Sequence, residues 1–158
     1  MEMTAPKQLL AVLKARDETL TGAESLTGGL VADTIVGVPG ASAVFKEAFV
    51  TYCDEAKART LGVPEEVLSS EGAISAACAK AMAEGAAKAA AADMAYATTG
   101  NAGPDAAEGK PVGLVYIAAC YRGRTQVKEL RLCGDRAGIR AQSAQEALAL
   151  CLKAAEDA

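Results

Sequence analysis

The chain contains no histidine among its 158 residues. This absence excludes catalytic triads and general bases that depend on an imidazole, and it excludes metal sites with histidine ligands. In a hydrolytic reaction, protons would have to be moved by a lysine, a tyrosine or a carboxylate. The sequence also has no Walker A loop, no GxGxxG and no cluster of metal ligands, so we expect neither a metal nor a cofactor.

Other scarce features narrow the class of protein further. Tryptophan is absent and aromatics make up only 4%, although 51% of residues are hydrophobic, so the core must consist mainly of aliphatic side chains and alanine. The net charge is −4 and no long basic run occurs, which argues against a nucleic-acid partner. No apolar stretch could cross a membrane or serve as a signal peptide. Five cysteines without a CxxC pair suit a reducing cytoplasm, where we expect the protein to lie.

Helical and strand patterns alternate along the first two thirds of the chain. An amphipathic helix is predicted around residues 9–13, and a second helix should follow Gly29 and end at Pro39-Gly40. Asp54 is a natural N-cap for a third helix that Gly62 closes. Strands are predicted at 20–23, 47–53 and 94–99, and an alanine-rich helix at 75–92.

The last third of the chain reads as a loop, a hairpin and a helix. Residues 100–113 are rich in glycine and proline and are predicted to form a loop. Two β-rich runs, 112–121 and 124–132, are separated by Arg122-Gly123, and a helix should cover 139–155. Together these elements predict a single α/β domain over residues 1–158, a three-layer α/β/α sandwich with a mixed sheet.

Ser25 lies where a strand turns into a helix. A hydroxyl can be exposed at such a turn, and the nearby N–H groups of residues 26–29 lack partners within the helix. Those N–H groups could stabilise an oxyanion or bind a phosphate. Ser25 or Thr27 could equally be an ordinary N-cap, and the local pattern leaves both interpretations open.

Tyr52 and Lys57 are separated by a predicted strand end and the first turn of a helix, so both could face one cleft. With Asp54 as N-cap, Lys57 would be at N3, where the helix dipole favours the neutral amine. A lysine that acts as a general base needs such an effect. The alternative is a solvated lysine paired with a glutamate, and a tyrosine that only packs on its strand.

Two further segments are candidates for ligand binding. Residues 98–104 follow a buried strand, and ligands of open α/β sheets bind beyond the carboxyl ends of strands, although a plain turn explains the same glycines. Arg136 and Arg140 are four residues apart, hence on one face if the helix has begun, and arginine suits phosphate binding. They could also be exposed arginines near a helix start.

Several blocks of the sequence, taken in order, resemble the family of the CinA C-terminal domain. The blocks are AESLTGGLVA, VPGASAVFKEAFVTYCDEAKARTLGV, EGAIS, MAEGA, TGNAGP, KPVGLVYIA and GDRAGIR. The resemblance implies hydrolysis of the carboxamide of nicotinamide mononucleotide, with Ser25 as nucleophile and Lys57 and Tyr52 as its partners. It also implies a nucleotide substrate, a homo-oligomer, and substrate-binding residues Thr27, Gly28, Gly29, Thr99, Gly100, Asn101, Ala102, Gly103, Arg136 and Arg140.

The sequence departs from the family pattern at two positions. Asn101 stands where an apolar residue is more frequent, and Leu26 where cysteine is frequent. Asn101 could alter the pocket, so an amidase for another small amide is an alternative. A second alternative is a non-catalytic nucleotide-binding or competence-associated module, since a fold does not determine a function. Some family members carry an additional N-terminal domain, and because these residues contain no counterpart of it we expect the stand-alone enzyme.

Overall fold

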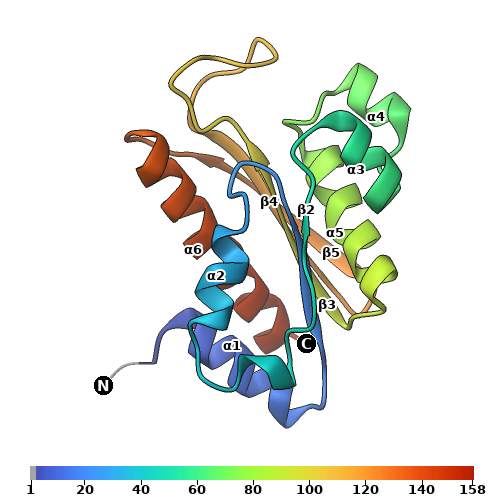
Figure 1. Cartoon of the computed structure of the whole chain (residues 1–158), viewed down its shortest axis with the longest axis vertical. Helices are drawn as coiled ribbons and strands as arrows, with labels where there is room; N and C mark the ends of the chain where they lie inside the picture. Colours follow the sequence, from blue (N-terminus) through green and yellow to red (C-terminus); the bar gives the residue numbers. More distant parts are fainter. Residues whose placement is uncertain (1–2) are drawn as a thin grey trace.

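A five-stranded sheet runs through the centre of the computed structural model, which describes residues 3–158 (Figure 1). Its strand order is β2-β1-β3-β4-β5. The strands are β1 (Leu20–Glu24), β2 (Phe49–Val50), β3 (Met94–Gly100), β4 (Leu114–Tyr121) and β5 (Arg124–Arg131). Strand β1 pairs in parallel with β2 and β3, whereas β3, β4 and β5 are antiparallel. The predicted mixed sheet is therefore confirmed.

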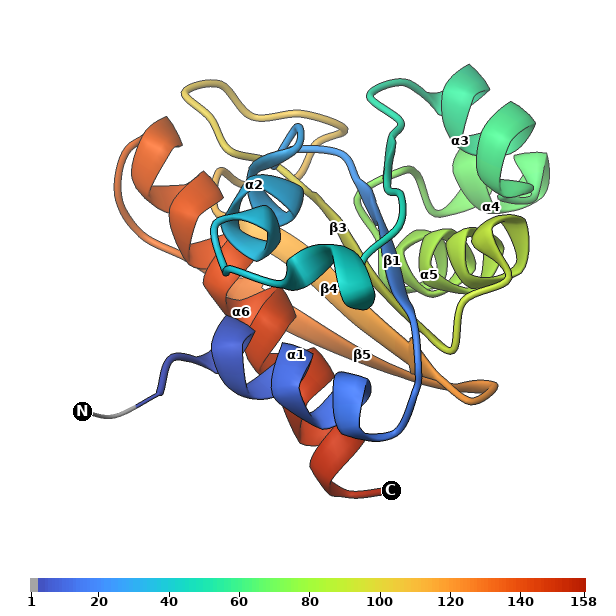
Figure 2. The ribbon, with the colours of Figure 1, turned by 60° about the horizontal axis from the view of Figure 1, so that its bottom comes forward.

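Helices cover both faces of the sheet (Figures 1 and 2). One layer contains α1 (Ala5–Ala15), α2 (Leu30–Val36), the 3₁₀ turn η1 (Ala41–Ala43) and α6 (Arg136–Glu156). The other layer contains α3 (Asp54–Leu61), α4 (Glu65–Ser70) and α5 (Ala76–Ala90). These two layers and the sheet confirm the three-layer α/β/α architecture.

Small residues allow α5 to lie close to its neighbours. A β-carbon added to Gly85 would be 1.9 Å from the carbonyl oxygen of Leu61, so α5 and α3 approach each other as closely as only glycine permits. Alanines 79, 83 and 86 of α5 are fully buried against the sheet. The alanine-rich composition thus produces tight packing of the layer that carries α3.

Three predicted boundaries are wrong in detail. The strand predicted over 47–53 is reduced to the two residues of β2, because this segment is a sheet edge that pairs with β1 on one side only. Helix α2 already ends at Val36, before Pro39-Gly40, and α6 begins at Arg136, where Asp135 caps it by accepting from the N–H of Gly138.

Two further features of the second layer differ from expectation. Cys53, and not Asp54, is the N-cap residue of α3, so Lys57 occupies the fourth helical position and not the third. The short helix α4 follows Pro64, where no element was predicted. Its six residues have no buried member, so the sequence carries no periodic apolar signal for it.

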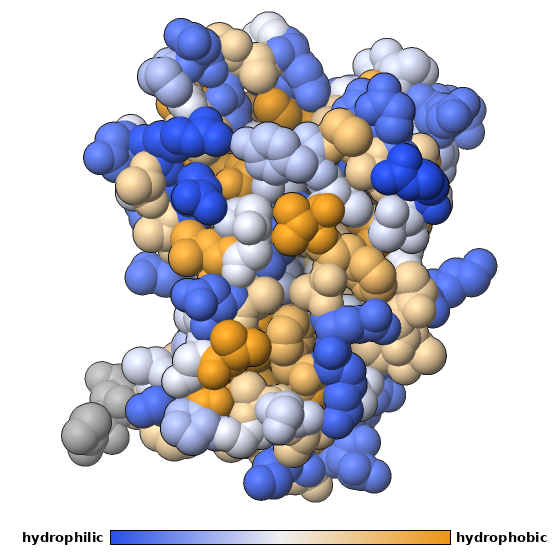
Figure 3. Space-filling model, viewed as in Figure 1, coloured by the Kyte–Doolittle hydropathy of each residue, from blue (hydrophilic) through white to orange (hydrophobic). Residues whose placement is uncertain are grey.

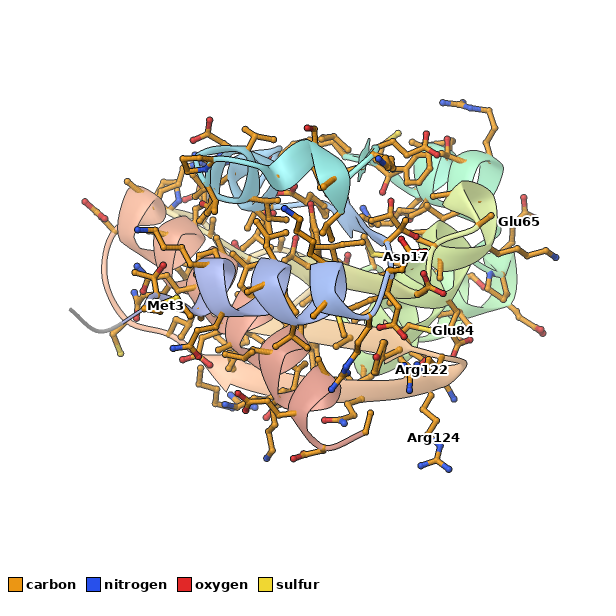
Figure 4. The ribbon with its side chains drawn as sticks, turned by 90° about the horizontal axis from the view of Figure 1, so that it is seen from below. Met3, Asp17, Glu65, Glu84, Arg122 and Arg124 are labelled. Atoms are coloured by element: carbon orange, nitrogen blue, oxygen red, sulfur yellow. The ribbon has the colours of Figure 1, made fainter. Side chains whose placement is uncertain are left out.

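The hairpin between β4 and β5 is confirmed. Arg122 and Gly123 both have positive φ, 52° and 79°, as a two-residue turn of this kind requires. Figure 4 views the molecule from this end, with Arg122 and Arg124 projecting from the hairpin. Arg122 Nε donates to Glu18 Oε1 at 2.8 Å, so the hairpin is tied to the chain segment before β1.

Five large apolar or aromatic side chains are exposed within residues 3–158. These include Val36 at the end of α2 and Val50 in β2, and Figure 3 shows apolar surface over this part of the molecule. Within residues 3–158, every helix is too short or too polar to cross a membrane.

Candidate active site

The parallel strands β1, β2 and β3 end at the same edge of the sheet. Ser25 follows β1, α3 follows β2, and the long loop after β3 lies at the same end of the molecule (Figure 1). A cavity of about 260 Å³ lies at this edge, as expected for an open α/β sheet. Its lining consists of Ser25, Leu26, Tyr52, Asp54, Lys57, Ala73, Ile74, Thr99, Gly100, Asn101, Ala102, Ala107, Glu108 and Arg136.

The side chain of Lys57 lines the cavity and contacts Ser25 directly. Its Nζ donates to Ser25 Oγ at 2.9 Å and to the carbonyl oxygen of Thr51 at 2.9 Å. Lys57 is only 2% exposed, whereas Ser25 is half-buried at the cavity wall. The alternative of a solvated surface lysine is therefore wrong, and the structure brings the two predicted residues into direct contact.

Burial lowers the pKa of Lys57 below its ordinary value of 10.5, because the charged amine is removed from water. The carboxylate of Asp54 opposes this shift, whereas the Cys78 thiol, whose own pKa burial raises to about 11, is uncharged near neutral pH. Within the described residues no carboxylate lies within ion-pair distance of Lys57, and both of its hydrogen-bond partners are neutral oxygens. The site therefore favours the neutral amine more than an exposed position would.

The turn after Ser25 is organised from inside the protein by Glu24. This fully buried carboxylate accepts from the hydroxyls of Thr27 (2.7 Å) and Tyr96 (2.9 Å). It also accepts the N–H groups of Gly29, Val31 and Ala32 at 3.0–3.1 Å. The N-terminus of α2 is thus already occupied by a side chain, as an anion at a helix start should be.

This arrangement corrects part of the sequence interpretation. The Thr27 hydroxyl is also 2.8 Å from Thr98 Oγ1, so it points into the protein and away from the cavity. The N–H of Gly28 donates to the carbonyl oxygen of Ser25, and that of Gly29 to Glu24, so neither is free for a substrate. Of the N–H groups predicted to face an oxyanion, only those of Leu26 and Thr27 have no acceptor within residues 3–158.

Gly28 and Gly29 serve the turn through their backbone conformation. Their φ angles are 56° and 107°, in the region that favours glycine. Neither residue lines the cavity. They allow the chain to leave β1 and enter α2 within a few residues, which keeps Ser25 at the cavity wall.

Tyr52 lies at the cavity mouth and not beside the Ser25–Lys57 pair. It is 61% exposed, and its hydroxyl accepts from Arg136 Nη2 at 3.0 Å. Among the described residues, no hydrogen bond joins this hydroxyl to Ser25 or Lys57. A part for Tyr52 in proton transfer therefore stays a prediction.

The loop after β3 forms another wall of the cavity. The Thr99 hydroxyl donates to the carbonyl oxygen of Ala73 at 2.6 Å, which ties β3 to the segment before α5. The Asn101 side chain accepts from the N–H of Gly103 at 2.9 Å. Gly100, Asn101 and Ala102 line the cavity, whereas Gly103 does not. Asn101 therefore shapes its own loop while remaining part of the wall.

The two arginines of α6 lie on one face of the helix, as predicted, but have different surroundings. Arg136 lines the cavity and donates to the carbonyl oxygen of Gly103 at 2.5 Å as well as to Tyr52. Arg140 does not line it and donates to the carbonyl oxygens of Leu26 (2.9 Å) and Thr27 (2.8 Å). The expectation that Arg140 faces a substrate phosphate is not supported by this geometry.

Sequence reasoning missed three charged residues near the cavity. Glu24 precedes Ser25 directly, and its position before a turn and helix was the available signal. Glu108 and Lys110 come from the loop: Glu108 Oε1 accepts from the N–H of Ile74 at 3.2 Å, and Lys110 Nζ donates to the carbonyl oxygens of Glu71 (2.6 Å) and Ile74. Nothing in the loop composition indicated these long-range contacts.

The assembled site contains a hydroxyl, a buried amine of lowered pKa and an arginine around one cavity. No group of three or more side chains in the described part of the chain could hold a metal ion. A hydroxyl beside an uncharged amine can act as a nucleophile, because the amine can accept its proton. The arrangement is therefore suited to covalent acyl transfer.

Comparison with known proteins identifies relatives over almost the full chain. Residues 2–155 match the family model of the CinA C-terminal domain. A CinA-like protein of Geobacter sulfurreducens is 50% identical over 82% of this chain, and one of Dictyoglomus turgidum is 44% identical over 88%. The chain spans about a third of the length of these curated relatives, 32% and 34% respectively.

Solved structures cover the same length as this chain. A competence-damaged protein (CinA) superfamily protein from Klebsiella pneumoniae has a TM-score of 0.94 and 34% identity, and covers 98% of this chain and 97% of its own. A competence/damage inducible protein from Agrobacterium tumefaciens has a TM-score of 0.91 and 35% identity, with 99% of both chains covered. These names describe the relatives and state no catalysed reaction.

Proposed function

The chain belongs to the family of the CinA C-terminal domain, and from that premise we propose that it hydrolyses the carboxamide of nicotinamide mononucleotide to nicotinate mononucleotide and ammonia. The observation that supports this proposal most directly is the 2.9 Å contact between Lys57 Nζ and Ser25 Oγ in a protein without histidine. A serine amidase needs a base, and Lys57 is the buried amine that touches the candidate nucleophile.

The contacts of Lys57 suggest how it would orient its lone pair. A neutral amine has two N–H groups and one lone pair, and one N–H is directed at the carbonyl oxygen of Thr51. In that form the contact with Ser25 reverses, so that the serine hydroxyl donates to the lone pair. The fixed backbone carbonyl thereby favours the orientation that proton abstraction requires.

In the proposed reaction, Ser25 Oγ attacks the carboxamide carbon and its proton passes to Lys57. The tetrahedral intermediate then collapses, the C–N bond breaks, and Lys57 returns the proton to the departing nitrogen, which leaves as ammonia. A nicotinoyl ester on Ser25 remains. Water, deprotonated by Lys57, hydrolyses this ester, releases the carboxylate product and restores the serine hydroxyl.

Two groups are proposed to assist this chemistry. The N–H of Leu26, which lines the cavity and has no acceptor among the described residues, is a candidate donor to the oxyanion. Arg136, at the cavity mouth, is the candidate for the substrate phosphate, because a guanidinium binds phosphate in a bidentate manner. Tyr52 shares a hydrogen bond with Arg136 and would move with it on substrate binding.

The cellular setting is part of the same proposal. We expect a cytoplasmic homo-oligomer that acts on a small nucleotide without a cofactor. Light scattering of the purified protein tests the assembly, and a mass equal to one chain would contradict that part alone.

The decisive test is ammonia release from nicotinamide mononucleotide by the purified wild-type chain and by Ser25→Ala. We expect release by the wild type and a loss on the order of 10⁶-fold in the variant, the effect of removing the nucleophile of a serine hydrolase. Equal rates would contradict the role of Ser25. Release from other amides but not from this nucleotide would identify an amidase of different specificity, and binding without release in both proteins would favour a non-catalytic module.

A further inference from the structure

Arg140 connects the C-terminal helix to the turn that carries the candidate nucleophile. It is half-buried on α6, 114 residues away from Leu26, and its Nε and Nη2 donate to the carbonyl oxygens of Leu26 and Thr27 at 2.9 and 2.8 Å. These two residues follow Ser25 directly. One planar guanidinium therefore fixes two consecutive peptide groups next to the nucleophile.

The partners of Arg140 distinguish it from a ligand of the substrate. Both bonded oxygens belong to the backbone, and no carboxylate in residues 3–158 lies within ion-pair distance of it. The cavity is lined by Arg136, one helical turn earlier, and not by Arg140. The two arginines therefore have different surroundings: Arg136 lines the cavity, whereas Arg140 binds the backbone of the turn after Ser25.

From this geometry we infer that Arg140 is a positioning residue for Ser25. It acts on the rate of the chemical step by holding the turn, and it does not bind the substrate phosphate. This inference rests on the proposed function in treating Ser25 as the nucleophile.

The contact has two physical consequences for the turn. First, it restricts the path of a segment in which Gly28 and Gly29 are both free to adopt other conformations. Second, the carbonyl of Leu26 and the N–H of Thr27 belong to one trans peptide and point in opposite directions. The guanidinium on the carbonyl side therefore polarises this peptide and makes the N–H of Thr27, on the side away from Arg140, more positive. Loss of the guanidinium would loosen the turn and weaken that polarisation.

The experiment compares Arg140→Ala and Arg140→Lys in the full chain. Two readouts are measured: kcat and KM for ammonia release from nicotinamide mononucleotide, and the rate at which a fluorophosphonate probe labels Ser25, followed by mass spectrometry. We expect Arg140→Ala to lower kcat and the labelling rate by about tenfold to a hundredfold, the effect of a slightly misplaced reacting group, with KM changed less than about threefold. Arg140→Lys should recover part of both rates, because it restores one of the two bonds.

Arg16→Ala is the matched control. Arg16 also donates to a backbone carbonyl of the α6 segment, that of Ala155, at 2.9 Å, and to the hydroxyl of Tyr121 at 2.8 Å, far along the helix from the cavity. Its loss should leave the labelling rate of Ser25 unchanged. If Arg140→Ala does not fold, Arg140→Lys alone is compared with this control, and a labelling rate below that of the control is expected.

Three results would overturn the inference. Arg140 variants that raise KM but keep kcat and the labelling rate would show a substrate ligand. Equal losses of labelling in Arg16→Ala and Arg140→Ala would show a general effect on stability. A wild-type Ser25 that the probe does not label would overturn both this inference and the proposed function. If the wild type is labelled but releases no ammonia from the nucleotide, only the proposed function fails, and the labelling rates decide about Arg140.

Discussion

The sheet buries an ionisable side chain on each of its two faces beside Ser25. On the face covered by α2, the carboxyl group of Glu24 accepts five hydrogen bonds, three from N–H groups at the start of the helix. On the face covered by α3 and α5, the amine of Lys57 has two hydrogen-bond partners, both neutral oxygens. Both side chains are almost fully buried. They differ in the number of protein hydrogen bonds that replace their lost contacts with water, which is larger for Glu24 than for Lys57.

This difference separates a structural group from a reactive one. A buried carboxylate surrounded by donors is stable as an anion and fixes its neighbours. A buried amine without a carboxylate partner is destabilised in its charged form and becomes a usable base. Ser25 lies between the two, so one face sets its position and the other would activate it.

The largest expected effect is the loss of activity when Lys57, the candidate base, is replaced. Lys57→Met should lower ammonia release by on the order of 10³-fold or more, because the general base is lost. Lys57→Arg should not restore it, since a guanidinium stays protonated. Steady-state rates measure this, and a variant that keeps more than about a tenth of the activity would contradict the assignment.

The same substitution should change how stability depends on pH. Because the folded pKa of Lys57 is lowered, the unfolded chain binds more protons between that value and 10.5, so this residue makes the wild type more stable as the pH rises through that window. Lys57→Met should lose this contribution. Chemical unfolding at a series of pH values measures it, and identical slopes in both proteins would count against a lowered pKa.

A smaller effect is expected when Glu24, the carboxylate that organises the turn, is replaced. Glu24→Gln keeps the shape but places an amide group against donors, which leaves at least one of them unpaired. We expect a loss of about 3 kcal/mol in the free energy of unfolding, which corresponds to roughly 6–12 °C in Tm for a chain of this size. Thermal unfolding measures it. A Tm within a degree or two of the wild type would mean that the five bonds are not needed.

The smallest expected effect comes from Thr51, whose backbone carbonyl binds Lys57. Its hydroxyl is buried and has no hydrogen-bond partner among residues 3–158. Thr51→Val replaces that hydroxyl with a methyl group of similar size, so we expect the free energy of unfolding to rise by about 1 kcal/mol. Urea unfolding checks this prediction, and a clear loss of stability would show that the hydroxyl has a partner, for instance a buried water.

Much of the fold could be predicted from the sequence because its elements carry strong local signals. Ser75 was expected at the start of the α5 helix and does cap it, by accepting from the N–H of Cys78. Arg122-Gly123 indicated the hairpin turn. In contrast, β2 and α4 are short and poorly buried, so their positions depend on tertiary contacts that no periodicity reveals.

The candidate site was predicted in part. Ser25 directly follows β1, and Lys57 lies near the start of the helix that follows β2, so the topology brings them to one edge of the sheet. The sequence identified both residues. The functions of Thr27 and Arg140 could not be predicted, because they depend on which way a side chain turns. Thr27 turns inward to Glu24, and Arg140 turns to the backbone of the Ser25 turn.

The most direct test of the account is the pKa of Lys57 itself, because the proposed chemistry requires an amine that is less basic than an exposed lysine. An NMR titration of the lysine side chains measures this pKa in the folded protein. The signal of Lys57 is assigned as the one that is missing from the spectrum of Lys57→Met. The account predicts that Lys57 titrates below its ordinary value of 10.5 and below the exposed lysines of the same chain. A Lys57 that titrates with the exposed lysines, or above them, would contradict it.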